Sequence, residues 1–200
     1  MTPHELVGIA AAIFALAAVV PYIWDIIGKI TKPNTVTYFV WTLLQSIAIY
    51  AQIQAGASWS VFLMVGTTIG TAVVFILSLT HYGYKHFTWV DAVSLVLAGF
   101  AILILIFTKH PVLAILLPIL GDAIGAMPTI VKTRDHPETE ERLAWFLMIV
   151  ACALGILATE KFDLANLAYP VFLLFEAIVI FCLAFFGKRK LVCKWGRGCV

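Results

Sequence analysis

The sequence has few charged residues. Asp, Glu, Lys and Arg make up only 12% of its 200 residues, against about 25% in a typical globular protein. Hydrophobic residues make up 62%. A soluble chain of this length keeps much of its area in contact with water, so it could not bury so much apolar surface. The composition therefore excludes a small soluble domain and indicates that lipid surrounds the chain.

The sequence also lacks the patterns of several functional classes. Its four cysteines do not form the disulfide pattern of a secreted protein, and no group of His and Cys has the spacing of a zinc site. There is no HExxH motif or Ser/His arrangement of a hydrolase, and the last apolar run has no lysine before Lys188, as a retinal protein would need. A net charge of +2 gives no support for nucleic-acid binding. We expect no enzyme activity, no metal, no cofactor and no nucleic-acid partner.

Long apolar runs are what the sequence does contain. A helix needs about 20 mostly apolar residues to cross a bilayer. Seven segments meet or approach that length, with polar breaks between them: 6–29, 35–54, 58–80, 89–108, 111–131, 142–159 and 164–186. We therefore predict an all-α membrane protein of seven transmembrane helices, with the lipid bilayer as a partner and the cell membrane as its location.

The loops indicate an orientation. Cytoplasmic loops of membrane proteins carry an excess of Lys and Arg. If the amino terminus is outside, all of the 13 Lys and Arg residues except Lys109 and Lys161 fall on the inner side. We predict an external amino terminus and a basic cytoplasmic tail. Cys193 and Cys199 lie in that tail, and their role, as acylated or as reduced thiols, stays open.

Two parts of the chain share a pattern. Each has a long apolar helix with an aspartate near a proline, then a second proline eight residues before a tryptophan. The matching pairs are Asp25 and Asp122, Pro21 and Pro128, Pro33 and Pro137, and Trp41 and Trp145. We predict a first three-helix repeat (1–82), a linker helix (83–110), a second three-helix repeat (111–187) and a tail (188–200). One linker helix gives both repeats the same orientation, as in parallel-repeat transporters; chance similarity of two hairpins is the alternative.

This organisation resembles the SWEET and PQ-loop superfamily of small-solute transporters. There the first helix of each repeat ends at a proline, often Pro-Gln, and here Pro21 and Pro128 stand at those places. The superfamily often has an asparagine in the third helix of each repeat, which Asn166 matches in the second half. The resemblance implies transport of a small polar solute, such as a sugar, an amino acid or a related metabolite, by alternating access. It also implies that Trp41 and Trp145 flank a central cavity.

Three of the carboxylates in the predicted spans are candidates for function, because ionisable groups are costly at membrane depth. Glu176 and Asp122 are near the middle of their spans, Asp25 is nearer the inner end, and no lysine or arginine lies in the middle of any span. Apolar surroundings favour a neutral carboxyl, which can exchange a proton, bind a cation or hold a substrate amine. We predict that these three residues couple a proton or cation. An interfacial Asp25, and interhelical hydrogen bonds for Asp122 and Glu176, are the alternatives.

Uncharged polar and aromatic residues follow helical faces around these acids. Those expected to contact a small-molecule substrate are Trp41, Gln45, Thr67, Thr71, Trp145, Asn166 and Tyr169. Both tryptophans also suit the aromatic belt at a membrane interface, and this alternative stays open. Proline removes a backbone hydrogen bond and kinks a helix, so we expect hinges at Pro21 and Pro128. Association into a homo-oligomer stays open.

A different class of function is also compatible with the pattern. A seven-helix receptor or sorting protein could bind a ligand on the same scaffold, by analogy alone. An anionic peptide end would need basic residues at membrane depth, and the sequence has none there. The loop KTRDHPETEER over 132–142 is interpreted as a solvated connector, with acidic residues suited to the start of a helix.

Overall fold

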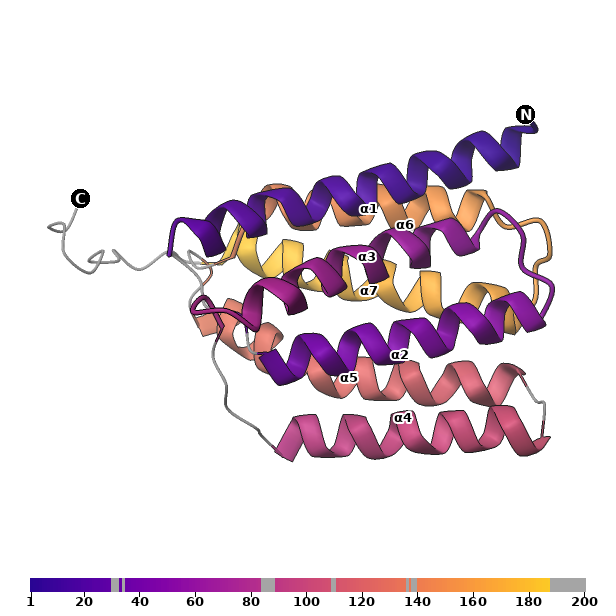
Figure 1. Ribbon diagram of the computed structural model, residues 1–200. Coiled ribbons are helices and arrows are strands. Elements are labelled where there is room, and N and C mark those ends of the chain that lie inside the picture. Colours follow the sequence, from indigo (N-terminus) through magenta and orange to yellow (C-terminus); the bar gives the residue numbers. More distant parts are fainter. Residues whose placement is uncertain are drawn as a thin grey trace, which may run out of the picture.

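The computed structural model describes residues 1–29, 33, 35–83, 89–108, 111–135, 137 and 140–187. Within these ranges the chain forms seven α-helices and no strand, arranged side by side along one bundle (Figure 1). They are α1 (Pro3–Ile27), α2 (Thr35–Gln54), α3 (Val61–Ser78), α4 (Trp89–Thr108), α5 (Pro111–Asp135), α6 (Arg142–Leu157) and α7 (Leu164–Phe186). The all-α prediction is confirmed, and the predicted segments 35–54, 89–108 and 164–186 have the bounds that the structure gives. Cys193, Cys199 and the rest of the tail lie outside the described residues.

Local side chains set where several helices begin and end. Thr2 caps α1 in a reciprocal box with Glu5, and each satisfies a backbone N–H of the other. Asp163 caps α7 by accepting a hydrogen bond from the backbone N–H of Asn166. Gly56 has a φ of 85°, a left-handed conformation that ends α2 and lets the chain turn back into α3.

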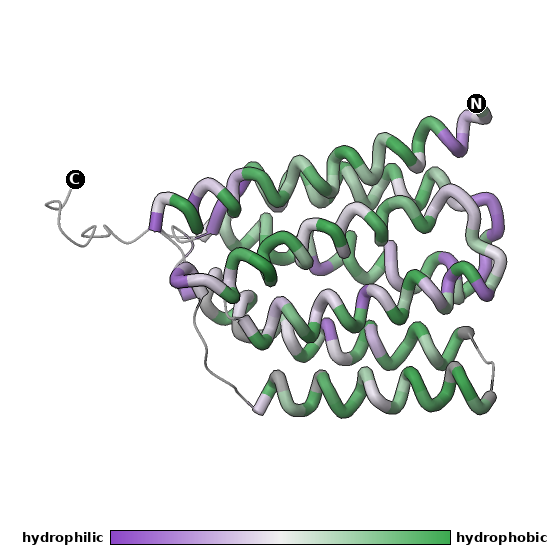
Figure 2. Tube along the Cα trace, in the orientation of Figure 1, coloured by the Kyte–Doolittle hydropathy of each residue, from purple (hydrophilic) through white to green (hydrophobic). Residues whose placement is uncertain are grey.

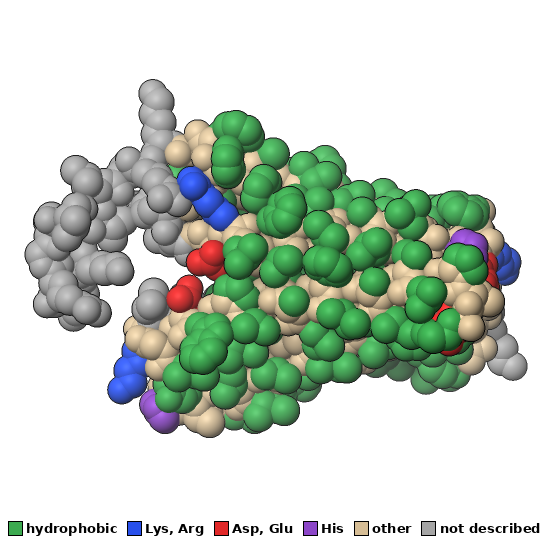
Figure 3. Space-filling view, turned by 90° about the horizontal axis from the view of Figure 1, so that it is seen from above, with side chains coloured by type: hydrophobic (Ala, Val, Ile, Leu, Met, Phe, Trp, Pro, Cys, Tyr) green, Lys and Arg blue, Asp and Glu red, His purple; other side chains and the backbone are tan. Residues whose placement is uncertain are grey.

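The outside of the bundle is apolar along its length. Five helices (α1, α2, α3, α5 from Val112, and α7) are long and apolar enough to cross a membrane. α6 has only 16 residues, and the apolar stretch found in α4 is Leu95–Ile104. Large side chains such as Ile13, Ile76 and Phe175 are 60–68% exposed, which water would penalise and lipid would not. Hydrophilic segments lie mostly at the two ends of the bundle (Figure 2), as do the charged side chains on the face in Figure 3. These features indicate a membrane protein.

The helices pack in a regular pattern. α3 packs against both α1 and α2, and α7 packs against both α5 and α6. The two groups meet where α1 packs against α6 and where α2 packs against α5. α4 packs against α5 and α2 at the edge of the bundle (Figure 1). The bundle therefore has two three-helix groups in contact and one peripheral helix.

Small residues allow these helices to approach closely. Alanine is the most frequent residue of the buried core. A Cβ added to Gly66 on α3 would come within 2.8 Å of the Ala12 carbonyl oxygen on α1, so this contact brings two backbones together. In a membrane, helices associate through van der Waals packing of this kind, because lipid gives no hydrophobic drive between them.

Candidate functional site

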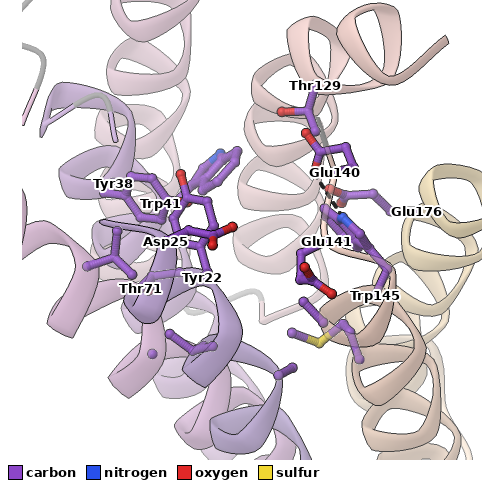
Figure 4. Close-up of a pocket in the computed structure, with 16 residues that line it drawn as sticks. Tyr22, Asp25, Tyr38, Trp41, Thr71, Thr129, Glu140, Glu141, Trp145 and Glu176 are labelled. Atoms are coloured by element: carbon purple, nitrogen blue, oxygen red, sulfur yellow. Dashed lines mark hydrogen bonds between the residues drawn. The ribbon is translucent and has the colours of Figure 1, made fainter. Parts of the chain in front are cut away.

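A cavity of about 210 Å³ lies between the two three-helix groups (Figure 4). Its lining comes from α1, α2 and α3 on one side, and from α5, the start of α6 and α7 on the other. Among the described lining residues, none comes from α4. The polar and aromatic members are Tyr22, Asp25, Tyr38, Trp41, Thr71, Thr129, Glu140, Glu141, Trp145 and Glu176.

Aromatic rings form one wall of the cavity. The rings of Tyr22 and Tyr38 stack with centroids 5.9 Å apart, and the Tyr38 ring meets Trp41 edge-on at 5.4 Å. Trp145 lies across the cavity from them (Figure 4), and its Nε1 donates a hydrogen bond of 3.1 Å to Oε2 of Glu140. These contacts hold the four rings in place, so aromatic surface faces the cavity from both sides.

A glycine on α5 makes room for Trp41. The indole Nε1 lies against Gly125, where an added Cβ would come within 2.6 Å of it. This Nε1 is buried and has no hydrogen-bond partner among the described residues. The position of Trp41 at the cavity therefore depends on the absence of a side chain at residue 125.

Four carboxylates line the same cavity. Asp25 projects from α1, Glu140 and Glu141 come from the two residues before α6, and Glu176 comes from α7. Oε1 of Glu141 accepts the Leu143 backbone N–H at 3.3 Å and so caps α6. Oε2 of Glu176 is buried and has no hydrogen-bond partner in the described part of the chain. The lining thus carries several acids, one of which has an unused acceptor.

No described Lys or Arg side chain lines the cavity to balance these acids. Arg142 follows Glu141 in the chain, but it binds the end of α7. Its Nε and Nη2 donate to the carbonyl oxygens of Ala184 and Phe185, at 3.0 and 3.3 Å, and its guanidinium lies 5.1 Å from the centre of the Phe185 ring. Among the described lining residues, acidic groups therefore outnumber basic ones.

Asp122 lies behind the cavity and does not line it. Its side chain is buried, and its Oδ2 accepts a hydrogen bond of 2.9 Å from the Tyr169 hydroxyl. Asp122 also interacts electrostatically with Glu176. An interhelical hydrogen bond was one alternative for both acids. Asp122 forms such a bond with Tyr169, whereas Glu176 lines the cavity.

Of the predicted binding residues, Trp41, Thr71 and Trp145 meet at the cavity. Gln45 is buried behind Thr71, and its Oε1 accepts a hydrogen bond of 3.2 Å from the Thr71 hydroxyl. Thr67 is buried and donates to the Met64 carbonyl. A binding role for Gln45, Thr67 and Tyr169 stays a prediction.

Asn166 does not reach this cavity. It lies at the start of α7, where its Nδ2 and backbone N–H both donate to Oδ1 of Asp163 at 3.0 Å. The described contacts make it part of the helix cap, and a binding role for Asn166 stays a prediction. Pro21 and Pro128 both lie inside helices, α1 and α5, and the side chain of Pro128 is outside the described part. The hinge role of both prolines stays a prediction.

Two loops are joined at the end of the bundle opposite Glu140 and Glu141. Lys161 Nζ donates a hydrogen bond of 2.8 Å to the Ala55 carbonyl, and Ser58 donates one to the Glu160 carboxylate. These contacts, here called the loop clasp (Ala55, Ser58, Glu160 and Lys161), connect the α2–α3 turn to the α6–α7 loop. The clasp therefore ties the first three-helix group to the second.

Five polar or aromatic members of the cavity are absent from the predicted site: Tyr22, Tyr38, Thr129, Glu140 and Glu141. The sequence places Glu140 and Glu141 in a connector with acidic residues suited to a helix start, and Glu141 is indeed the N-cap of α6, but the sequence does not indicate that both residues line a cavity. Tyr22 and Tyr38 were not proposed as site residues. Their signal was present in part, since Tyr38 and Trp41 are three residues apart and so share a helix face.

Comparison with protein-family models, with curated proteins and with solved structures finds no match to this chain. The geometry of the site is therefore the basis on which a function is inferred.

Proposed function

We propose that this protein carries a small polar solute across the cell membrane by alternating access, with proton or cation coupling. The observation that supports this most is a cavity with acidic and aromatic lining, between two three-helix groups that are clasped at the opposite end. A membrane protein with a static structural role would not need ionisable groups and space between its halves.

The proposed topology has seven spans, with the amino terminus outside and the tail in the cytoplasm. α4 and α6 lie alongside the five helices long enough to span, which supports counting them as spans (Figure 1). The loop clasp would then face outward and the cavity would be nearer the cytoplasm. This corresponds to an inward-facing state, with the pathway closed at the outer end.

The packing pattern supports two parallel repeats. Exchanging α1 with α5, α2 with α6 and α3 with α7 turns each observed packing pair within one group into a pair within the other. The same exchange turns the α1–α6 contact into the α5–α2 contact. We also propose that the chain belongs to the SWEET and PQ-loop superfamily and that it is not an enzyme.

In this mechanism, solute binds in the cavity, and the two groups rock about their α1–α6 and α2–α5 contacts. The clasp opens as the cytoplasmic side closes. Glu176 faces the solute, and Asp122 lies close behind it, so the charge of one affects the other. A proton or cation taken up at this pair would change the relative stability of the two states, which is how coupling arises.

Uptake into proteoliposomes tests the proposal. The purified protein is assayed with sugars, amino acids and amines, with and without a pH gradient. We expect uptake of at least one solute that responds to the gradient, and loss of this response in the double variant Glu176→Gln, Asp122→Asn. The control Glu5→Gln removes a carboxylate at the far end of α1 and retains the capping pattern. Unchanged coupling in the double variant would contradict the role of the acids, and no uptake of any solute would contradict transport.

A further inference from the structure

We infer that the cavity binds a small organic ammonium ion that has an N–H group and carries no acid group. This inference rests on the proposed function and names the class of its substrate. The charge, the aromatic walls, the unused acceptor and the size of the cavity each favour this class of ligand.

The acidic groups of the described lining favour a cation. Asp25 faces the cavity from α1, and Glu140, Glu141 and Glu176 face it from the opposite group (Figure 4). The nearest basic residue along the described chain, Arg142, is bound to the α7 carbonyls. An anionic group placed here would find no cationic partner among the described lining residues, and an ionised acid on either side would repel it.

The aromatic walls favour an organic cation over a metal ion. Trp41, Trp145, Tyr22 and Tyr38 present ring surface, and ammonium groups are attracted to the faces of such rings. Metal ions instead need several ligands close together. In the described part of the chain, no three His, Cys, Asp or Glu side chains are grouped so that they could hold one.

The unused acceptor indicates an N–H donor. Oε2 of Glu176 is buried at the cavity and lacks a hydrogen-bond partner among the described residues. Buried polar atoms are nearly always hydrogen-bonded, and an unpaired one is costly. A protonated primary or secondary amine supplies the missing donor, whereas a quaternary ammonium does not.

The size of the cavity and the lack of basic residues in its described lining narrow the class of ligand further. The cavity holds about 210 Å³, below the roughly 300–1,000 Å³ of drug-sized ligand pockets, so the ligand is small. Amino acids carry a carboxylate that would lie unpaired among the four acids. Simple aliphatic amines avoid this penalty, and amines with two ammonium groups can pair with both walls.

Calorimetric titration of four matched compounds tests this inference on the full-length protein. The protein is placed in nanodiscs of phosphatidylglycerol, whose headgroup has no amine. The compounds are 1,4-diaminobutane, butylamine, ornithine, which is 1,4-diaminobutane with one added carboxylate, and the neutral 1,4-butanediol. We expect both amines to bind, ornithine to bind at least ten-fold more weakly than 1,4-diaminobutane, and the diol not to bind. Equal binding of ornithine, equal binding of the diol, or no binding of either amine would overturn the inference.

Variants assign the binding to this cavity. Glu176→Gln keeps the side-chain size and should weaken 1,4-diaminobutane binding at least ten-fold, whereas Glu5→Gln at the far end of α1 should leave it unchanged. Trp145→Leu should also weaken it, and Trp24→Leu, at a site 69% exposed on α1, should not. Equal effects of a cavity variant and its control would place the binding elsewhere. If a cavity variant fails to fold, the four compounds on the unaltered protein still decide the matter.

Uptake of the same amines separates this inference from the proposed transport. Binding of 1,4-diaminobutane without uptake of any solute would contradict transport and leave the ligand class standing. Uptake of a sugar or an amino acid, with no binding of either amine, would contradict the ligand class and leave transport standing.

Discussion

The Tyr169 hydroxyl donates a hydrogen bond of 2.9 Å to the Asp122 carboxylate, and both side chains are buried. The bond joins α7 to α5 inside the second three-helix group. Because Asp122 also interacts electrostatically with Glu176, a change at the cavity can alter this bond. The pair therefore connects the cavity lining to the packed interior.

Removing this hydroxyl should destabilise the protein modestly. Tyr169→Phe leaves the ring in place and deprives Asp122 of its donor. We expect the free energy of unfolding to fall by about 0.6–1.7 kcal/mol, in the range measured for interhelical hydrogen bonds in a membrane. Reversible unfolding in mixed micelles measures it. The control Tyr50→Phe changes a tyrosine that is 53% exposed and should have little effect; equal losses would show that the bond contributes nothing specific.

A single methyl group at Gly125 should displace Trp41. The added Cβ of Gly125→Ala would come within 2.6 Å of the indole Nε1, so the ring must move at the cavity wall. We expect lower thermal stability, a shifted tryptophan emission and weaker ligand binding. Gly99→Ala on α4 is the matched control, because an added Cβ there meets nothing within 4 Å. The free energy of unfolding of Gly99→Ala should rise by up to about 1 kcal/mol, because alanine has a higher helix propensity than glycine. If both variants behave alike, the close contact of Gly125 with Trp41 has no consequence.

Breaking the loop clasp should favour a form of the protein in which the α2–α3 turn and the α6–α7 loop are separated. Ser58→Ala with Lys161→Met removes both contacts between the α2–α3 turn and the α6–α7 loop. Exposed polar contacts contribute about 0.2–1 kcal/mol each, so we expect a several-fold rise in the open population. Electron–electron resonance distances between spin labels at Gln54 and Leu164 measure it, with the native cysteines replaced. Arg134→Gln alters an exposed ion pair at the other end and should leave the distances unchanged. An unaltered distance distribution in the double variant would show that the clasp does not hold the loops.

The cap of α7 should make stability depend on pH on the acid side. Desolvation opposes the charged form of Asp163, but hydrogen bonds from Asn166 and the ammonium of Lys161 at 3.3 Å outweigh it, so the pKa of Asp163 is lowered. A lowered folded-state pKa stabilises the fold above the unfolded value, about 3.9, and this stabilisation is lost as pH falls through the folded value. Between pH 6 and pH 3 the unaltered protein should lose more unfolding free energy than Asp163→Asn, which caps without titrating. Equal losses would assign the acid sensitivity to other groups.

The helices could be predicted from sequence because their signal is local. Apolar runs of about 20 residues, separated by breaks such as the Gly56 turn, are enough to define them. The bounds of α2, α4 and α7 were predicted correctly, because each is flanked by polar or glycine-containing residues. The cap of α7 joins Asp163 to Asn166, only three residues apart, so this contact too depends on local sequence.

The site was harder to predict because its members meet only through packing. Trp41 and Trp145 could be paired by their shared spacing after a proline. Glu140 could not be placed, since an acid beside a helix start is equally common in open solvent. The fit of Trp41 against Gly125 depends on how α2 and α5 cross, which no local pattern contains.

The peripheral position of α4 has a consequence for how the cavity can change over evolution. α4 contributes no described residue to the lining and packs on the outside of α2 and α5. In a dimer of two identical three-helix chains, every substitution would occur twice, once on each wall of the cavity. Here the two walls belong to one polypeptide, and the helix that joins them contributes no described residue to the cavity. Each wall can therefore mutate on its own, and an acid such as Glu176 can arise on one side while the facing side keeps its tyrosines.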